Sequence, residues 1–265
     1  MTDEAQTDTI RTEIDDEGIC TVTLHRPKAL NAMNGELVDF LWHTFYELSY
    51  EPRARVIVLT GSGAKAFCVG ADLKERAGMS EAAVAKRIDE YGKCFGAIEH
   101  VSKPVICAIN GYAFGGGLEM ALACDLRVMA EDTRVGLTEL KLGIIPGAGG
   151  TQRLPRLIGP SRAKELIFTG ARIDAPRALE LGLVDRVAPK GQVVGVAKEL
   201  ARAMLDSAPL ALAQAKIAIN QGIQADLGTG IQLESRCYAT LLDTQDRVEG
   251  LNAFKEGRKP EFKGT

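Results

Sequence analysis

The segment Phe114-Gly115-Gly116-Gly117-Leu118-Glu119 joins a run of glycines to an apolar stretch that ends at Cys124. Glycine is unfavourable inside a helix but suits a place where the backbone approaches another group closely. We therefore predict a tight turn and then a short helix over 116–124, whose first N–H groups lack helical partners. An anionic oxygen held by the Gly116 N–H would have Glu119, one turn later, on the same face. Taken alone, the segment also fits a plain turn with a glutamate that complements the helix dipole.

Two further segments extend this pattern. In Phe67-Cys68-Val69-Gly70-Ala71-Asp72, the Ala71 N–H is the candidate for a second donor, and a helix start capped by Asp72 is the plain alternative. Glu139 precedes a glycine-rich loop over 146–150, which we expect to pack and to fix the Glu139 segment. The alternative for Glu139 is an exposed carboxylate at a helix start. Two convergent N–H donors and two carboxyl groups suit a thioester carbonyl that becomes an enolate.

Other motifs exclude competing kinds of site. Residues 61–66 match G-x-G-x-x-A, but the apolar, strand-like segment that follows does not fit a dinucleotide-binding helix. The loop over 146–150 lacks the G-K-[ST] ending of a phosphate-binding loop. Cys68 has no basic neighbour in its apolar run, so we predict a buried, unreactive thiol. The sequence contains no G-x-S-x-G motif of a hydrolase triad.

The composition is that of a globular protein of 265 residues with a formal net charge of −3. This charge gives no general attraction to nucleic acid, and every apolar run is too short to span a bilayer. The start of the chain is polar and acidic, without the pattern of a secretory or transit peptide. The six cysteines form no C-x-x-C pair and have no histidine at ligand spacing, so we expect a cytoplasmic protein without disulfides or a metal site.

The order of elements predicts an α/β fold with a mostly parallel sheet. Apolar or alternating runs predict strands over 18–25, 54–60, 104–110 and 125–130. Helical spacing predicts helices over 34–48 and 80–98, the second with Ser80 as its N-cap.

The composition changes after about Ala188, where nearly every segment has helical spacing. We predict helices over 192–205, 209–221, 229–242 and 247–254, followed by an extended basic tail. The chain is therefore expected to divide into an α/β core over residues 1–190 and a helical C-terminal region over 191–265.

These segments, in this order, resemble the crotonase (enoyl-CoA hydratase/isomerase) superfamily. The matching stretches are residues 25–32, 66–75, 115–119 and 143–154, and the resemblance covers essentially the whole chain. It implies a spiral core of ββα units with a helical C-terminal region for trimerisation, so that the chain forms a homotrimer or a hexamer built as a dimer of trimers. It also implies an acyl-CoA substrate and no separate cofactor, since CoA is part of the substrate.

The resemblance assigns roles to the residues above. The N–H groups of Ala71 and Gly116 form the oxyanion hole for the thioester oxygen, and Glu119 and Glu139 are the two catalytic glutamates. We expect these carboxyls to hold a water, with Glu119 as the base during attack at C3 and Glu139 as the acid toward C2. The resemblance also places a set of residues near CoA: Arg26, Lys28, Val69, Asp72, Leu73 and Lys74.

Within the family, the closest resemblance is to methylglutaconyl-CoA hydratases of leucine breakdown, through residues 70–77, 149–156, 163–168 and 215–222. It implies a lyase that hydrates 3-methylglutaconyl-CoA, and the alternative is a general short-chain enoyl-CoA hydratase of fatty-acid β-oxidation. Arg76 and Lys141 are candidates by charge alone for reading a distal carboxylate. Gly257 stands where many relatives carry a lysine that reaches a neighbour's CoA, so Arg258 or Lys259 would have to replace that contact.

A role of a different class is RNA binding, which some relatives carry out through lysines along the first helix. The corresponding segment, 34–48, contains no lysine or arginine and carries Glu36, Asp39 and Glu47. Affinity for nucleic acid depends on several basic contacts to phosphates. The sequence therefore predicts no nucleic-acid partner, and the two intact glutamates disfavour a catalytically silent assembly subunit.

Overall fold

The computed structural model describes residues 5–6 and 9–265, and in it two sheets form the centre of the molecule. The larger sheet has the strand order β1-β2-β3-β4-β6-β8-β11. Its first three strands are antiparallel, and every neighbouring pair from β3 to β11 is parallel. The strands are β1 (Ala5–Gln6), β2 (Ile10–Ile14), β3 (Ile19–Leu24), β4 (Val56–Gly61), β6 (Val105–Ile109), β8 (Leu126–Ala130) and β11 (Arg186–Ala188).

The central strands are covered on both faces. β4 and β6 are buried at every residue, which is why their sequences are continuous apolar runs rather than alternating ones. Ile57 and Leu59 of β4 belong to the larger core cluster on one side of the sheet. Val56 and Val58 pack on the other side, in a cluster that includes residues of α8 (Val193–Leu205).

The smaller sheet has the order β10-β9-β7-β5, with β5, β7 and β9 parallel and β10 antiparallel. Along the chain, β4 leads to β5, β6 to β7 and β8 to β9, and helical segments follow each pair. This repetition is the ββα spiral that the resemblance implied. The strands are β5 (Ala66–Cys68), β7 (Tyr112–Phe114), β9 (Arg134–Gly136) and β10 (Ile173–Asp174).

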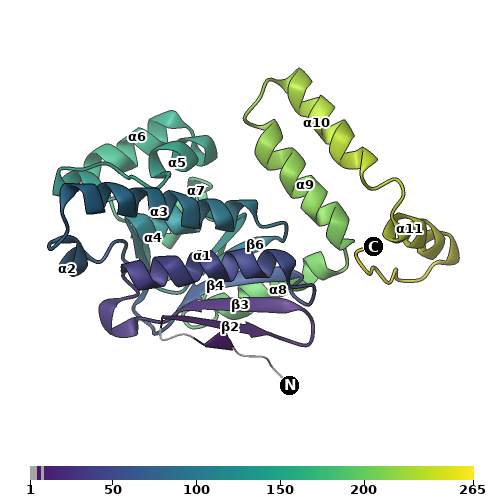
Figure 1. Cartoon of the computed structure of the whole chain (residues 1–265), viewed down its shortest axis with the longest axis horizontal. Helices are drawn as coiled ribbons and strands as arrows, with labels where there is room; N and C mark the ends of the chain where they lie inside the picture. The colour runs from purple at the N-terminus through teal and green to yellow at the C-terminus, as the bar shows by residue number, and fades with distance from the viewer. Residues whose placement is uncertain (1–4, 7–8) are drawn as a thin grey trace.

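The helices α1 (Gly35–Tyr50) and α3 (Glu81–His100) run side by side across one face of the larger sheet (Figure 1). The Ser80 hydroxyl accepts a hydrogen bond from the Ala83 N–H, so its prediction as an N-cap is confirmed. The remaining helical segments of this half are η1 (Pro27–Ala29), α2 (Leu73–Arg76), α4 (Gly116–Ala123), η2 (Glu139–Leu142), α5 (Gly150–Ile158), α6 (Pro160–Thr169) and α7 (Ala175–Glu180).

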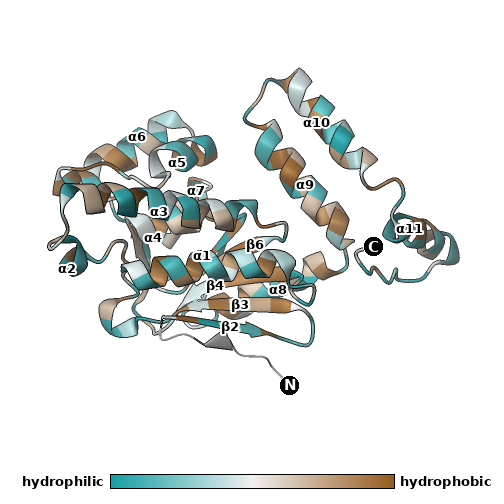
Figure 2. Ribbon diagram, in the orientation of Figure 1, coloured by the Kyte–Doolittle hydropathy of each residue, from teal (hydrophilic) through white to brown (hydrophobic). Residues whose placement is uncertain are grey.

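The last three helices extend from the core as an arm (Figure 1): α9 (Pro209–Gly222), α10 (Leu227–Ala239) and α11 (Gln245–Glu256). Figure 2 shows hydrophobic residues along α9 and α10 away from the core. The exposed fractions of Ile219, Ile223, Leu227 and Phe254 are 66%, 69%, 80% and 87%. The helix α8 packs on the larger sheet and therefore lies with the core. The expected division of the chain at residue 190 stays a prediction.

An ion pair attaches the arm to the sheet. The Lys216 ammonium on α9 donates to the Asp125 carboxylate at 2.8 Å and to the Lys103 carbonyl at 3.0 Å. Asp125 also accepts a hydrogen bond of 2.7 Å from the Val105 N–H at the start of β6.

Over the described part of the chain, no helix is both long enough and apolar enough to cross a bilayer.

Candidate active site

A broad cleft opens where β5, β7 and β9 end. The carboxyl ends of parallel strands meet at one edge of a sheet, so segments far apart in the sequence converge there. The cleft has a volume of about 1520 Å³, larger than the about 300–1,000 Å³ of a typical small-molecule pocket. It is lined by all ten residues that the resemblance placed in the oxyanion hole, in catalysis or near CoA: Arg26, Lys28, Val69, Ala71, Asp72, Leu73, Lys74, Gly116, Glu119 and Glu139.

Two backbone N–H groups lie together on one wall of this cleft. Ala71 is held by a bridge to Met33, whose N–H donates to the Gly70 carbonyl at 2.8 Å and whose carbonyl accepts from the Asp72 N–H at 3.0 Å. A Cβ added at Gly116 would lie 3.9 Å from the Ala71 nitrogen. Among the described residues, no backbone acceptor is bonded to either N–H, so both remain available to an oxygen in the cleft.

Glycine is required where β7 passes into α4. Gly115 has a φ of +53°, a conformation that side chains other than glycine rarely adopt. A Cβ at Gly116 would lie 2.6 Å from the Met33 Cε atom, and one at Gly117 would lie 2.0 Å from the Cys68 carbonyl oxygen. The glycine run therefore brings the start of α4 against the end of β5.

Glu119 lies one turn into α4 and is 3% exposed. Its Oε1 atom accepts two hydrogen bonds of 2.8 Å, from the N–H groups of Ala148 and Gly150. The loop over 146–150 therefore holds Glu119, a contact that the sequence did not indicate, and its effect on the Glu139 segment stays a prediction. Burial raises the pKa of Glu119, and these two hydrogen bonds oppose the rise because they favour the carboxylate.

Glu139 begins η2 just after β9 and is 8% exposed, so the alternative of an exposed carboxylate is wrong. Both carboxyl oxygens are buried and without a hydrogen-bond partner among the described residues. The carboxyl lies against Gly115, where an added Cβ would be 3.1 Å from Oε1. Burial raises the pKa of Glu139 to about 7, and the negative charge of Glu119 contributes to the rise. Near neutral pH, Glu139 is therefore protonated in a large fraction of molecules.

Two of the residues expected near CoA bind each other. The Arg26 guanidinium donates to the Asp72 carboxylate through both terminal nitrogens at 3.0 Å, and also to the Ala32 carbonyl. Asp72 caps α2 as well, since it accepts from the N–H groups of Lys74 and Glu75. This network fixes the backbone on both sides of Ala71, so Arg26 and Asp72 brace the segment that carries the free N–H.

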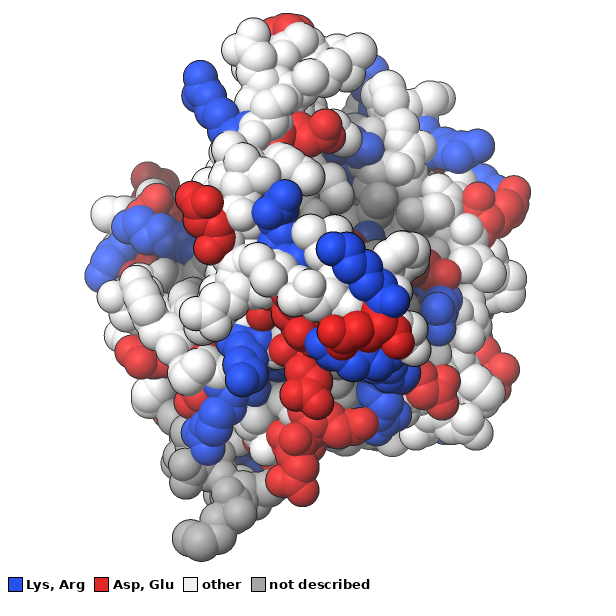
Figure 3. Space-filling model, turned by 90° about the vertical axis from the view of Figure 1, so that its right-hand side faces the viewer, with Lys and Arg blue, Asp and Glu red and all other residues white. Residues whose placement is uncertain are grey.

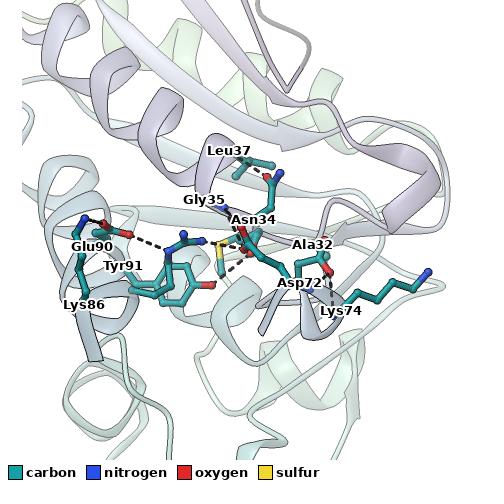
Figure 4. Close-up of polar contacts among 12 residues, drawn as sticks. Ala32, Asn34, Gly35, Leu37, Asp72, Lys74, Lys86, Glu90 and Tyr91 are labelled. Atoms are coloured by element: carbon teal, nitrogen blue, oxygen red, sulfur yellow. Dashed lines mark hydrogen bonds and ion pairs between the residues drawn. The ribbon is translucent and has the colours of Figure 1, made fainter. Parts of the chain in front are cut away.

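A second network holds the same segment against α1 and α3 (Figure 4). The Glu75 carboxylate accepts from the Gly35 N–H at 3.2 Å and from Arg87 at 2.9 Å. The Tyr91 hydroxyl donates to the Met33 carbonyl at 3.3 Å. The cleft wall is thus bonded to two long helices of the core.

Other residues of the cleft were not evident from the sequence. The Arg172 guanidinium lies 4.5 Å from the centre of the Phe114 ring, and both residues line the cleft with Lys141 and Arg76. Arg172 directly precedes β10, which is placed by its pairing with β9. No spacing along the sequence therefore pointed to this residue. Cys68 lies beneath the wall, where burial raises the pKa of the thiol to about 12, as expected for an unreactive cysteine.

Comparison with known proteins agrees with this arrangement. The family model described as enoyl-CoA hydratase/isomerase matches residues 15–265. The crystal structure of an enoyl-CoA hydratase from Bacillus anthracis has a TM-score of 0.95 and 47% identity, covering 97% of this chain and 100% of that chain. An enoyl-CoA hydratase structure from Mycobacterium smegmatis has a TM-score of 0.91 and 30% identity, with 97% and 99% covered.

A curated human relative is named mitochondrial methylglutaconyl-CoA hydratase. It is 43% identical over 95% of this chain and 76% of its own length. The match of the family model over nearly the whole chain, together with these identities, shows the family. The chain belongs to the enoyl-CoA hydratase/isomerase family.

Proposed function

We propose that this enzyme adds water across the C2–C3 double bond of a 2-enoyl-CoA thioester. The observation that carries the proposal is the meeting of two buried glutamate carboxyls and two unbonded backbone N–H groups in one cleft. The N–H groups of Ala71 and Gly116 hold the thioester oxygen as it becomes the oxygen of an enolate. Removing one such donor typically costs about 2.7–4 kcal/mol of barrier.

The two carboxyls divide the proton transfers. Glu119 is the base: its Oε1 is held by two N–H groups, so its other oxygen takes the proton from water while the hydroxyl oxygen bonds to C3. Glu139 is the acid: it carries a proton near neutral pH and gives it to C2 as the enolate collapses. The products are the 3-hydroxyacyl thioester, a protonated Glu119 and an ionised Glu139, and one proton transfer through solvent restores the enzyme.

The preferred substrate in this proposal is 3-methylglutaconyl-CoA, which carries a distal carboxylate. The identity to the human methylglutaconyl-CoA hydratase supports it, and so does the presence of three cations in the cleft lining, Arg76, Lys141 and Arg172. Arg76 is half-buried, whereas Lys141 and Arg172 are exposed, so a distal carboxylate should gain a modest charge contact at this wall of the cleft. Relatives named simply as enoyl-CoA hydratases favour the second candidate, a general short-chain hydratase.

A panel of enoyl-CoA thioesters with and without a distal carboxylate tests both levels of the proposal. We expect hydration of all short substrates and the highest kcat/KM on 3-methylglutaconyl-CoA. Equal or higher kcat/KM on crotonyl-CoA would leave a general short-chain hydratase. No hydration of any member would remove the hydratase assignment.

The assembly and the compartment are part of the proposal. The exposed apolar residues of the arm support a homotrimer or a hexamer, since surfaces of this kind are usually covered by a partner. All six cysteines are free and buried, which supports a reducing compartment such as the cytoplasm. Light scattering of the purified chain measures the mass of the assembly.

A further inference from the structure

Arg153 on α5 connects the loop that holds Glu119 to helix α3. Its Nη1 atom donates to the Ala148 carbonyl at 2.9 Å, and the Ala148 N–H donates to Glu119 at 2.8 Å. On its other side, Arg153 donates to the Glu99 carboxylate through Nη2 at 2.6 Å and through Nε at 3.2 Å. Ala148 is therefore hydrogen-bonded through both of its backbone groups: its N–H donates to Glu119, and its carbonyl accepts from an arginine that is itself bonded to α3.

The loop is shaped around this guanidinium. Gly149 has a φ of +106°, and a Cβ added there would lie 2.1 Å from the Arg153 Nη1 atom and 3.1 Å from its Cζ atom. The Arg153 N–H also donates to the Gly149 carbonyl at 2.7 Å. The glycine between the two donors, Ala148 and Gly150, thus leaves the room that the guanidinium occupies.

Arg153 also acts on Glu119 through its charge. Burial raises the pKa of Glu119, and the N–H bonds from Gly150 and Ala148 oppose this rise, as does the positive charge of Arg153. The negative charge of Glu119 in turn raises the pKa of Glu139, and the Glu99 carboxylate on α3 faces Arg153. A loss of Arg153 would therefore weaken both the placement of the base and the preference for its ionised form.

We propose that Arg153 is a positioning residue for the base: through the Ala148 carbonyl it sets the loop whose N–H groups orient Glu119, and Glu99 holds it in place. This rests on the proposed function, in which Glu119 takes the proton from water. Arg153 itself does not line the cleft, so it touches neither the thioester nor the water. The alternative is a brace between α3 and α5 that contributes to stability alone.

Three variants separate these roles. Arg153→Met removes the charge and the donors at similar length, and Arg153→Lys keeps the charge with one donor group. Arg156→Met is the matched control, because Arg156 lies one turn further along α5 and binds Gln152 and Gln224 instead of the loop. For Arg153→Met we expect kcat to fall about 10- to 100-fold, the scale of a small misplacement of a reacting group, with KM changed little.

The pH profile is the measurement that a simple brace would not change. In Arg153→Met the acidic limb of kcat/KM should move to higher pH, because the cation that favours ionised Glu119 is gone. Arg153→Lys should restore much of the rate and of the profile, and Arg156→Met should match the wild type in both. An unchanged kcat and acidic limb in a folded Arg153→Met enzyme would overturn the proposal, as would a fall in Tm alone.

Hydrogen exchange of the substrate-free enzyme provides a readout that does not depend on catalysis. The amides of Ala148 and Gly150 should lose protection in Arg153→Met and keep it in Arg156→Met. If Arg153→Met does not fold, Glu99→Gln takes its place, because it keeps Arg153 but weakens the contact that holds its guanidinium. The amides of Ala148 and Gly150 should then also lose protection, to a smaller extent. A wild type that hydrates no enoyl-CoA would contradict the proposed function, whereas unchanged exchange at both amides would contradict the role of Arg153.

Discussion

At the residue scale, the two glutamates have the same chemistry and different surroundings. One carboxyl oxygen of Glu119 accepts hydrogen bonds from two backbone N–H groups, while neither oxygen of Glu139 has a hydrogen-bond partner among the described residues. Hydrogen bonds to a carboxylate favour its ionised form, and burial without such bonds favours the protonated one. These surroundings support the proposed division into a base and an acid.

The first prediction concerns removal of each carboxyl in turn. Glu119→Gln and Glu139→Gln should each lower kcat by at least about 10²-fold, the usual contribution of a general acid or base. KM for the CoA ester should change little, since the oxyanion donors and the cleft remain. Steady-state kinetics on crotonyl-CoA measure both constants, and a Glu139→Gln enzyme with near wild-type kcat would remove Glu139 from the mechanism.

The second prediction links Glu139 to stability. Its pKa is raised from 4.5 to about 7 in the folded chain, so the folded state binds its proton more tightly than the unfolded state does. The resulting stabilisation is complete below about pH 4.5 and is lost as the pH rises through about 7. Glu139→Gln cannot ionise, so its Tm relative to wild type should be higher at pH 8 than at pH 5. Thermal unfolding at the two pH values tests this, and a constant difference would contradict the raised pKa.

The third prediction concerns the space beside the Gly116 N–H. Gly116→Val should abolish turnover, because its side chain would crowd the position of the thioester oxygen next to the Ala71 N–H. The atom that a new Cβ meets first is the Cε of Met33, the end of a flexible side chain, so the fold and the proposed assembly should survive. Circular dichroism and light scattering serve as controls for the kinetic assay, and retained kcat would mean that the oxyanion is bound elsewhere.

At the scale of elements, the sequence predicted those helices and strands that show a hydrophobic periodicity or a long apolar run. The buried strands β4 and β6 and the helices α1 and α3 lie within a few residues of their predicted bounds. The short strands β7 and β9 were missed, because three residues carry no recognisable alternation. They are also the strands that aim Gly116 and Glu139 into the cleft, so sequence patterns identified the residues of the site more readily than the elements that assemble it.

The contacts that orient those residues were the least predictable. The hydrogen bond from Ala148 to Glu119 joins positions 29 residues apart, and no local spacing announces it. The same holds for Arg26, whose bond to Asp72 spans 46 residues. Such pairs depend on how distant loops and helices pack in the folded chain, which a single sequence does not reveal.

The fourth prediction concerns the attachment of the arm. Lys216→Met should leave Asp125 without its cation beside β6; the Lys216 and Asp125 side chains are 9% and 24% exposed, so the cost should exceed the about 0–1 kcal/mol of an exposed pair. Lys198→Met is the control, because Lys198 pairs with Asp15 at 2.9 Å and is the more exposed of the two lysines, at 24%. Denaturant unfolding should show a larger loss of stability for Lys216→Met, and equal losses would mean that the arm is held by other contacts.

At the scale of the whole molecule, charge is distributed rather than gathered. On the face in Figure 3, lysine and arginine side chains alternate with aspartate and glutamate and form no continuous basic surface. The basic tail is partly neutralised, since Arg258 binds both Glu249 and Glu256. On α1, the exposed residues include the stacked aromatic pair Trp42 and Tyr46, and the helix has no lysine or arginine.

The fifth prediction follows from this distribution: binding to RNA should be negligible at physiological salt. Sequence-independent affinity requires several cations on phosphates, and each such contact steepens the loss of affinity with salt. A net charge of −3 and an α1 helix without lysine or arginine argue against such a set, and the cations near the cleft are better suited to a CoA ester. A gel-shift titration with an AU-rich RNA at about 150 mM salt, where phosphate contacts are already weakened, measures this directly. Saturable submicromolar binding would contradict the prediction and would make the segment from Lys255 to Lys263 the first place to substitute.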